Sequence, residues 1–447
     1  MENSPAPASI SRRRLLGTAA GAVAGFTIVP RHVLGGPRHI PPSEKLNVAG
    51  IGVGGQGGSD IAKMAGENVI ALCDVDAKRA AGSFKKFEKA ERFEDFRVML
   101  EKVKGIDAVV IGTPDHIHAP AAVAAMQLGK HVYVEKPMAH TIYETRRMRD
   151  VAREAKVVTQ MGNQGHAGEG LRLTKEWIQA GAIGKVTEVH CWSDRPGKFW
   201  RQDVPVPEKG QPVRDGLNWD LWLGPAAFRD YHEVYCPRAW RGWWDFGCGA
   251  IGDMAVHNAD PAFYALDLDP PIAAEAQTAP VNPNTLPLWN IIHLYFAAKG
   301  DQPAVRFTWY DGGKQPPRPE GLEKERELGD NGIYFVGDKG VILCGGWAGT
   351  PRLVPESAMQ AFQRPEKSIP RSPGHHEEWI AACKANKPED AKAGFDYSAP
   401  FTESLFVGNL AARLGKRIEW DSANMKATNA PEADPLINKA YRDGFAV

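Results

Sequence analysis

The sequence Leu-Asn-Val-Ala-Gly-Ile-Gly-Val-Gly-Gly-Gln-Gly at residues 46–57 decides the fold of the first half of the chain. Residues 46–53 form a short apolar run typical of a buried strand, and residues 52–57 have the pattern Gly-x-Gly-x-x-Gly. These glycines permit a tight turn, a close approach of the backbone to a pyrophosphate, and close packing of helix on strand. A helical stretch follows at residues 60–65, and a second apolar run ends at Asp74. This order of elements predicts a dinucleotide site with the pyrophosphate at a helix N-terminus; the alternative is a glycine-rich turn without a ligand.

The choice of cofactor depends on Asp74, which stands about 20 residues after Gly52, the spacing at which an acid binds a ribose hydroxyl. Because a carboxylate repels a 2′-phosphate, the sequence favours NAD over NADP. The neighbouring cations Lys78 and Arg79 weaken this preference. The predicted cofactor contacts in this part of the chain are Gly52, Gly54, Gly55, Gln56, Gly57 and Asp74.

Three more apolar runs end in polar or glycine-containing segments. Residues 107–112 lead into Thr-Pro-Asp-His-Ile-His at 113–118, and residues 131–134 lead into Glu135-Lys136-Pro137. A further strand at 157–161 ends in Gly-Asn-Gln. Alternating strands and helices predict a doubly wound parallel sheet, whose ligands bind at the carboxyl ends of the strands. The predicted cofactor contacts from these ends are Thr113, Pro114, His118, Glu135, Lys136 and Gln164.

The second half has a different pattern, with alternating apolar and polar residues at 186–192, 291–298 and 305–310, and a hairpin at 332–344. This predicts an α+β domain with an antiparallel or mixed sheet. Residues 375–386 and 400–414 are predicted helices, with His375 and His376 in a solvated first turn. The predicted divisions are a leader at 1–42, a Rossmann domain at 43–165, a substrate and oligomerisation domain at 166–421, and a C-terminal wrap at 422–447.

The stretch 238–257 is rich in tryptophan and glycine and contains Asp253 and His257, four residues apart. On a regular helix this spacing places both side chains on one face. A carboxylate beside an imidazole raises its basicity and orients it, which suits a general base; the alternative is an exposed helical pair. Trp240 and Trp243 are candidates to stack on a sugar ring, and core packing is the alternative.

The N-terminus contains Ser-Arg-Arg-Arg-Leu-Leu at residues 11–16, followed by a mildly apolar run to residue 29. A twin arginine before such a run predicts a twin-arginine export signal and a periplasmic location; the alternative is a disordered basic tail. No later segment is long and apolar enough to predict a membrane span. Because that pathway exports folded proteins, a cofactor bound in the cytoplasm would be carried along.

The composition excludes several classes of function. The chain has 447 residues with 54 basic and 54 acidic side chains, so its zero net charge gives no electrostatic reason to expect nucleic acid as a partner. The six cysteines show no zinc-binding spacing and no disulfide framework, and we predict no metal site.

Together, the motifs at 52–57, 113–118, 135–137 and 249–257 resemble those of the Gfo/Idh/MocA oxidoreductases over residues 43–421. The resemblance, including the twin-arginine leader of the exported bacterial branch, implies a Rossmann domain and a large open-faced sheet domain with the active site between them. It implies hydride transfer between NAD(P) and a carbohydrate or cyclitol, and a homo-oligomer (dimer or tetramer) built on the sheet. Lys136 matches the family's catalytic lysine, and Asp253 and His257 match its paired residues. Asp115 departs from the asparagine that is common in the family.

The roles that follow are His257 as base, Asp253 as its orienting partner, and Lys136 as the group that stabilises charge on the reacting oxygen. The roles of Lys136 and His257 are exchangeable at this stage. Asn163, Gln164 and His166 are candidates to line the same cleft. Two other functions stay open: a glycosidase that retains NAD and oxidises the sugar transiently before elimination, and a non-catalytic sugar- or nucleotide-binding relative. Export favours a tightly bound, recycled NAD.

Overall fold

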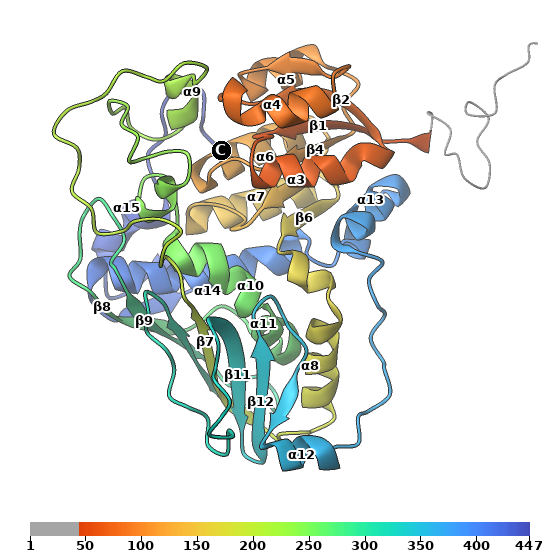
Figure 1. The fold of residues 1–447 in the computed structure, drawn as a ribbon, viewed down its shortest axis with the longest axis vertical. Helices are drawn as coiled ribbons and strands as arrows, with labels where there is room; N and C mark the ends of the chain where they lie inside the picture. The colour runs from red at the N-terminus through yellow and green to blue at the C-terminus, as the bar shows by residue number, and fades with distance from the viewer. Residues whose placement is uncertain (1–43) are drawn as a thin grey trace, which may run out of the picture. The chain divides into compact units, whose positions relative to one another are not determined.

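Six parallel strands form the first sheet, in the order β3-β2-β1-β4-β5-β6. Figure 1 shows β1, β2 and β4 of this sheet among the helices of the first domain. The computed structural model describes residues 44–447, so the predicted export signal and leader lie outside the described residues. Residues 46–447 form one unit, separate from residues 1–45. The strands are β1 (Asn47–Ile51), β2 (Asn68–Cys73), β3 (Glu91–Phe93), β4 (Ala108–Ile111), β5 (His131–Glu135) and β6 (Thr159–Gly162).

Helices connect these strands in the way the sequence predicted, which confirms the Rossmann domain. The first helix of residues 44–447 starts at Gln56, inside the Gly-x-Gly-x-x-Gly motif and four residues before the expected stretch 60–65. Strand β1 is central and almost wholly buried, which explains its uninterrupted apolar sequence. The helices are α3 (Gln56–Lys63), α4 (Ala77–Lys86), α5 (Phe96–Lys102), α6 (Asp115–Gln127) and α7 (Ile142–Ala155).

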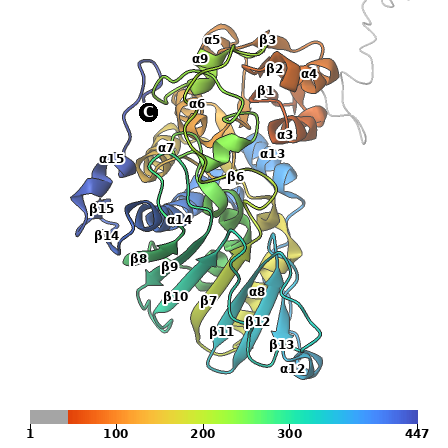
Figure 2. The same cartoon turned by 60° about the vertical axis from the view of Figure 1, so that its left-hand side comes forward.

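The second sheet has nine strands in the order β13-β12-β11-β7-β10-β9-β8-β14-β15 (Figure 2). Only the β7–β10 pair is parallel, so the sheet is mostly antiparallel, as predicted. Its strands are β7 (Val186–Ser193), β8 (Ala273–Thr278), β9 (Asn290–Phe296), β10 (Val305–Tyr310), β11 (Asn331–Gly337), β12 (Gly340–Gly345), β13 (Arg352–Val354), β14 (Ile418–Asp421) and β15 (Lys426–Ala427).

Helix α14 joins the two domains, because it packs against α7 of the first domain and against β8 and β9 of the second. It spans Phe395–Leu414 and contains Pro400, so the expected start at residue 400 was five residues late. One continuous core cluster contains side chains of both sheets, among them Val109 and Phe307. The site between the domains is therefore held by shared packing. The other helices of the second half are α8 (Glu169–Gln179), α9 (Trp219–Leu223), α10 (Val256–Asn258), α11 (Asp260–Leu266), α12 (Glu356–Ala361), α13 (His375–Ala385) and α15 (Asp434–Ile437).

Helix α13 lies far along the chain, yet it packs on the first domain through Trp379. The expectation of a solvated first turn is wrong, since His375 and His376 are both buried. His376 bonds Asp60 of α3 and stacks on Tyr133 of β5. A helical segment that looks polar in sequence is thus covered by tertiary packing.

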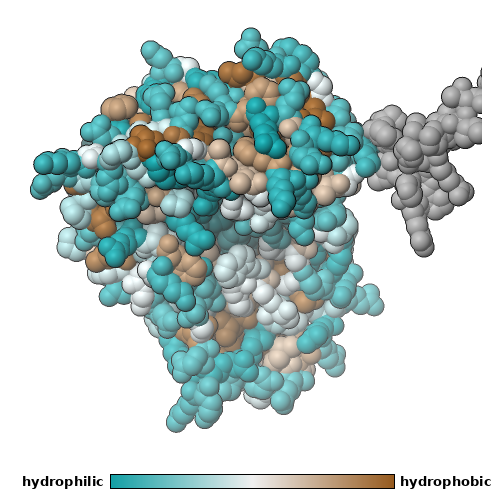
Figure 3. Space-filling view, turned by 45° about the horizontal axis from the view of Figure 1, so that its top comes forward, coloured by the Kyte–Doolittle hydropathy of each residue, from teal (hydrophilic) through white to brown (hydrophobic). Residues whose placement is uncertain are grey.

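The C-terminal segment combines irregular stretches with the short helix α15 and returns to the first domain. Phe445 packs on Phe96 of α5, and the Arg97 guanidinium lies 4.2 Å from the centre of the Phe445 ring. Within the predicted C-terminal wrap, 422–447, the structure contains the two-residue strand β15 and the four-residue helix α15. The face shown in Figure 3 is mainly hydrophilic, with hydrophobic residues scattered over it. Among residues 44–447, no helix is long and apolar enough to cross a membrane.

Candidate active site

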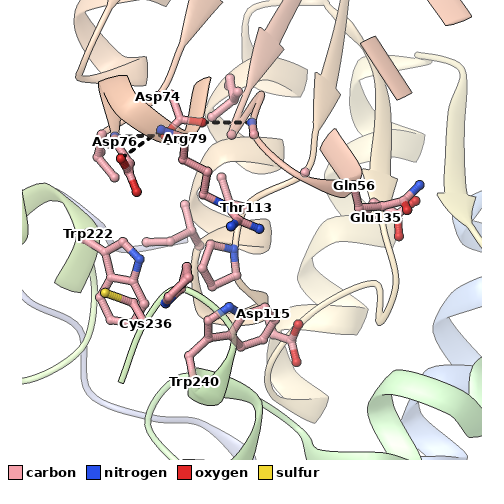
Figure 4. A pocket seen from close by; sticks show the side chains of 18 of the residues that line it. Gln56, Asp74, Asp76, Arg79, Thr113, Asp115, Glu135, Trp222, Cys236 and Trp240 are labelled. Atoms are coloured by element: carbon pink, nitrogen blue, oxygen red, sulfur yellow. Dashed lines mark hydrogen bonds between the residues drawn. The ribbon is translucent and has the colours of Figure 1, made fainter. Parts of the chain in front are cut away.

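A cavity of about 350 Å³ opens at the carboxyl ends of β1, β2, β4 and β5, where the sequence placed the site (Figure 4). Its walls come from the first domain, from residues of the second domain and from the C-terminal segment. The predicted site residues that line it are Gly52, Gly54, Gln56, Asp74, Thr113, Pro114, Glu135, Lys136, Gln164, Trp240, Asp253 and His257.

The glycines of this turn stand at positions where a side chain would not fit. Gly52 has φ +73°, and a Cβ there would lie 2.7 Å from the backbone nitrogen of Thr113. A Cβ on Gly57 would collide with the carbonyl oxygen of Gly52. Helix α3 begins here without a side-chain cap, so its first N–H groups are free to bind an anion. Gly55 and Gly57 do not line the cavity themselves, but the cradle they help to form fits a dinucleotide pyrophosphate.

Asp74 is fixed at the end of β2 by two backbone groups. Its carboxylate accepts hydrogen bonds from the N–H of Gly54 at 3.1 Å and from the N–H of Asp76 at 2.9 Å. Burial raises the pKa of Asp74 to about 6, although these bonds favour the charged form. Each oxygen keeps a lone pair, so the carboxylate is placed to accept ribose hydroxyls.

A long segment, residues 194–247, crosses the Asp74 end of the cavity, and we call it the strap. Its Arg214 forms an ion pair with Asp76, and the N–H of Ala77 donates to the carbonyl of Gly216 at 2.8 Å. The strap residues Arg214 and Trp222 line the cavity, as does Phe445 of the C-terminal segment. The Asp74 end is therefore bordered by two segments that come from outside the first domain.

The opposite end of the cavity contains a cluster of three charged side chains. The Nζ of Lys136 donates to the carboxylate of Asp253 at 2.6 Å and to its backbone carbonyl at 3.0 Å. The Nε of Arg241 donates to the same carboxylate oxygen at 3.0 Å. Burial alone would raise the pKa of Asp253, but the two cations outweigh it and hold that pKa well below the usual value. Asp253 is thus a permanent anion that fixes the position of Lys136.

The structure does not bear out Asp253 as the partner of His257. The Asp253 carboxylate bonds Lys136 and Arg241, and among residues 44–447 no hydrogen bond joins it to His257; residues Ile251–Ala255 form a π-helical turn in place of the expected regular helix. Within the described residues, the Nδ1 of His257 is buried without a hydrogen-bond partner. Burial, followed by the charge of Lys136, lowers the pKa of His257 to about 3, so the ring is neutral at physiological pH.

Asp115, the departure from the family pattern, is buried at the first turn of α6. Its carboxylate accepts a hydrogen bond from the N–H of Cys248 at 3.0 Å. Burial raises its pKa to about 7, against the influence of Arg241 and Lys136. Asp115 therefore carries a proton for part of the time and links the first domain to the backbone at residue 248.

Four other predicted site residues lie outside the cavity lining. His118 bonds the carbonyls of Pro137 and Thr113 and so supports two loops of the site. Asn163 and His166 both bond the buried Asp260, so their assignment to the substrate cleft is wrong. Trp243 is fully buried in an aromatic cluster of the strap, so its assignment as a sugar-stacking residue is also wrong. No local pattern indicated Asp260 as the partner of Asn163 and His166, because it lies 97 and 94 residues further along the chain.

Sequence reasoning missed three side chains that line the cavity near His257. Arg241 belongs to the stretch that was singled out, but nothing in its spacing indicated a bond to Asp253. Arg195 and Trp347 stand in loops after β7 and β12 and carry no local pattern. Among residues 44–447, no group of three or more His, Cys, Asp or Glu side chains is arranged to hold a metal ion.

The fold and the cavity define a two-domain protein with a Rossmann domain and a mostly antiparallel sheet domain. Residues 46–163 match the family described as "Oxidoreductase family, NAD-binding Rossmann fold", and residues 172–302 match its C-terminal alpha/beta domain. The chain belongs to the Gfo/Idh/MocA family.

Several curated proteins resemble the chain over part of its length. Levoglucosan dehydrogenase of Pseudarthrobacter phenanthrenivorans is 26% identical over 43% of this chain and 41% of its own. Inositol 2-dehydrogenase of Salmonella typhimurium is 30% identical over 42% of this chain and 57% of its own. The aligned region thus spans about half the length of these relatives.

Solved structures show the same fold over most of the chain. The WlbA dehydrogenase of Bordetella pertussis, in complex with NADH and UDP-GlcNAcA, has a TM-score of 0.58 at 21% identity and covers 84% of this chain and 99% of its own. The aldose-aldose oxidoreductase of Caulobacter crescentus has a TM-score of 0.53 at 16% identity, with 84% and 100% covered.

Proposed function

We propose that the protein is an NAD-dependent oxidoreductase that acts on a CH–OH group of a carbohydrate or cyclitol. The observation that carries this proposal is the Lys136–Asp253–Arg241 cluster in the same cavity as the glycine turn and Asp74. When bound, NAD supplies the acceptor or donor of a hydride. The names of the curated relatives, which include an inositol dehydrogenase and a levoglucosan dehydrogenase, support this substrate class.

Lys136 moves the proton in this proposal. In the direction of reduction its ammonium donates a proton to the carbonyl oxygen of the substrate, and in oxidation the amine takes that proton back. Asp253 and Arg241 hold Nζ in place. His257, with its pKa lowered to about 3 by burial, is too weak a base for this role at neutral pH. In this proposal His257 therefore forms a hydrogen bond with the substrate hydroxyl, and Lys136 takes the acid–base role of the two that the sequence left exchangeable.

A second candidate is a redox-neutral reaction on a glycoside, in which NAD stays bound and recovers its hydride. The strap and Phe445 border the Asp74 end of the cavity. This arrangement supports retention of the cofactor. Export through the twin-arginine pathway to the periplasm, proposed from the arginine pair, is consistent with a retained cofactor. Replacing Arg12 and Arg13 by lysine should leave the protein in the cytoplasm, and an unchanged periplasmic yield would reject the export signal.

We also propose a homo-oligomer, a dimer or tetramer, through the second sheet. Its outer face carries partly exposed side chains that bond across strands, such as Arg306 with Glu188. Residues 312–330 cover another part of that face through contacts with Trp192 and Tyr334. Light scattering of the purified protein tests this directly, and a monomer at micromolar concentration would reject it.

The decisive experiment compares Lys136→Met with Lys104→Met, a change of an exposed lysine on the same domain. Bound nucleotide is released by denaturation and identified, and turnover is followed on inositols, anhydrosugars, aldoses and aryl glycosides. Lys136→Met should lower turnover by about a hundredfold or more while the NAD content stays unchanged. Net NADH formation identifies the dehydrogenase, and glycoside cleavage without net NADH identifies the second candidate. Equal turnover of the two variants would reject the role of Lys136.

A further inference from the structure

A second cavity, of about 230 Å³, lies behind residues 247–248 and shares no lining residue with the first. The peptide of Cys248 separates the two spaces. Its N–H donates to Asp115 at the first cavity, and its carbonyl accepts from the side chain of Asn409, which lines the second. The second cavity is therefore a distinct site and no extension of the cofactor pocket.

Arg413, in the last turn of α14, contributes a charged group to this cavity that lacks a counterion. Its guanidinium carbon lies 4.8 Å from the centre of the Trp244 ring. It forms no hydrogen bond or ion pair with any residue of the described part, 44–447. Its compensating contacts are the Trp244 ring and, without a hydrogen bond, the charge of Asp245. Because an arginine stays protonated in proteins, this partly buried cation still lacks the hydrogen-bonded counterion that would offset its desolvation.

The other charged groups at the cavity are already neutralised. The Nζ of Lys439 pairs with Glu144 at 2.8 Å and donates to the Nδ1 of His140 at 2.9 Å. Burial and the charge of Lys439 hold the pKa of His140 well below its usual value, so that ring is neutral. Asp245 forms an ion pair with Arg229 of the strap. One uncompensated positive charge remains, that of Arg413.

The wall of the cavity also has an apolar part beside these polar groups. Ile142, Pro225, Phe406, Leu410 and Leu436 line it, and Trp244 adds a flat aromatic surface. A single cation beside such a wall suits a ligand with one negative group and an apolar body, because the charge pairs with Arg413 while the body leaves water.

We propose that this second cavity binds a small organic carboxylate, with the guanidinium of Arg413 bonding the carboxylate and the apolar wall enclosing its body. The guanidinium presents parallel N–H donors that match the two oxygens of a carboxylate. A neutral molecule of the same shape would leave Arg413 without its counterion and should bind much more weakly.

The test uses the full protein saturated with NAD, so that the first cavity is filled. Benzoate, its neutral isostere benzamide and inorganic phosphate are titrated by calorimetry and by thermal shift. Benzoate should bind saturably, benzamide should show no saturable binding, and phosphate should bind more weakly than benzoate. Tighter binding of phosphate than of benzoate would overturn the assignment of an apolar body.

Arg413→Gln should weaken benzoate binding at least about tenfold. Arg417→Gln, just beyond the same helix end, serves as the matched control, because Arg417 pairs with the exposed Glu419 and does not line the cavity. Should Arg413→Gln fail to fold, Ala440→Trp places an indole at an exposed residue of the lining and should block benzoate equally. The proposal would be overturned if benzoate did not bind the wild type. It would also be overturned if the folded Arg413→Gln and Ala440→Trp variants bound benzoate with the same affinity as the wild type. A change of oligomeric state in Arg413→Gln would overturn it too, since it would mark the cavity as an interface between copies.

Discussion

Replacing Asp115 with asparagine should make the protein more stable at alkaline pH and change its stability little at acidic pH. The amide oxygen of the variant would still accept the N–H of Cys248, and its amide N–H would mimic the O–H of the protonated acid. Burial raises the pKa of Asp115 from 3.8 to about 7 in the folded protein. The stabilisation that the protonated acid provides is therefore complete below about pH 4 and is lost as the pH rises through 7.

The size of the change in stability follows from the difference between the two pKa values of Asp115, 3.8 and about 7. One pKa unit corresponds to about 1.4 kcal/mol, so Asp115 should cost the wild type about 3 kcal/mol between pH 5 and pH 8. At about 2.1 cal/mol/K of unfolding entropy per residue, this corresponds to a change of about 3 °C in the thermal midpoint of roughly 400 residues.

The assay is thermal unfolding of the wild type and of Asp115→Asn, with NAD removed, at half-unit steps from pH 5 to pH 8. The difference between their midpoints should grow by about 3 °C in favour of the variant as the pH rises. Asp301→Asn, at an exposed position, provides the control and should show a constant difference. A difference between wild type and Asp115→Asn that stays constant with pH would refute the assignment of a buried, partly protonated Asp115.

Three further changes test the cofactor end of the cavity. Gly57→Ala should abolish NAD binding, because its Cβ would collide with the carbonyl of Gly52. Fluorescence titration with NADH measures the affinity, and an unchanged affinity would contradict the turn geometry. Asp74→Ala should weaken NAD binding and reduce discrimination against NADP, which paired titrations measure; a wild type that already prefers NADP would rule out the role of Asp74. Arg214→Met should speed NAD release about tenfold in stopped-flow displacement by removing the ion pair that fastens the strap, whereas the exposed Arg238→Met should leave the rate unchanged. Equal release rates for the two variants would show that the strap does not retain NAD.

The sequence by itself determined the first domain and the position of its site. The glycine turn is a local steric requirement, and the buried strands are contiguous apolar runs, so both can be recognised without knowledge of distant contacts. The strand ends at Asp74, Thr113 and Lys136 then follow from the rule that ligands bind at the carboxyl edge of a parallel sheet. The alternating pattern of the second half determined a mostly antiparallel sheet for the same reason of local periodicity.

Tertiary structure decided which side chains meet at that site. Lys136 and Asp253 are 117 residues apart and come together only when the two domains pack. The Asp253 carboxylate bonds Lys136 and Arg241, partners that its spacing of four residues from His257 cannot reveal. Burial of His375 and the docking of Phe445 likewise depend on partners from remote segments. Spacing along the chain fixes neighbours only within a regular element, and the pairing of charges across domains is set by packing, which no local pattern encodes.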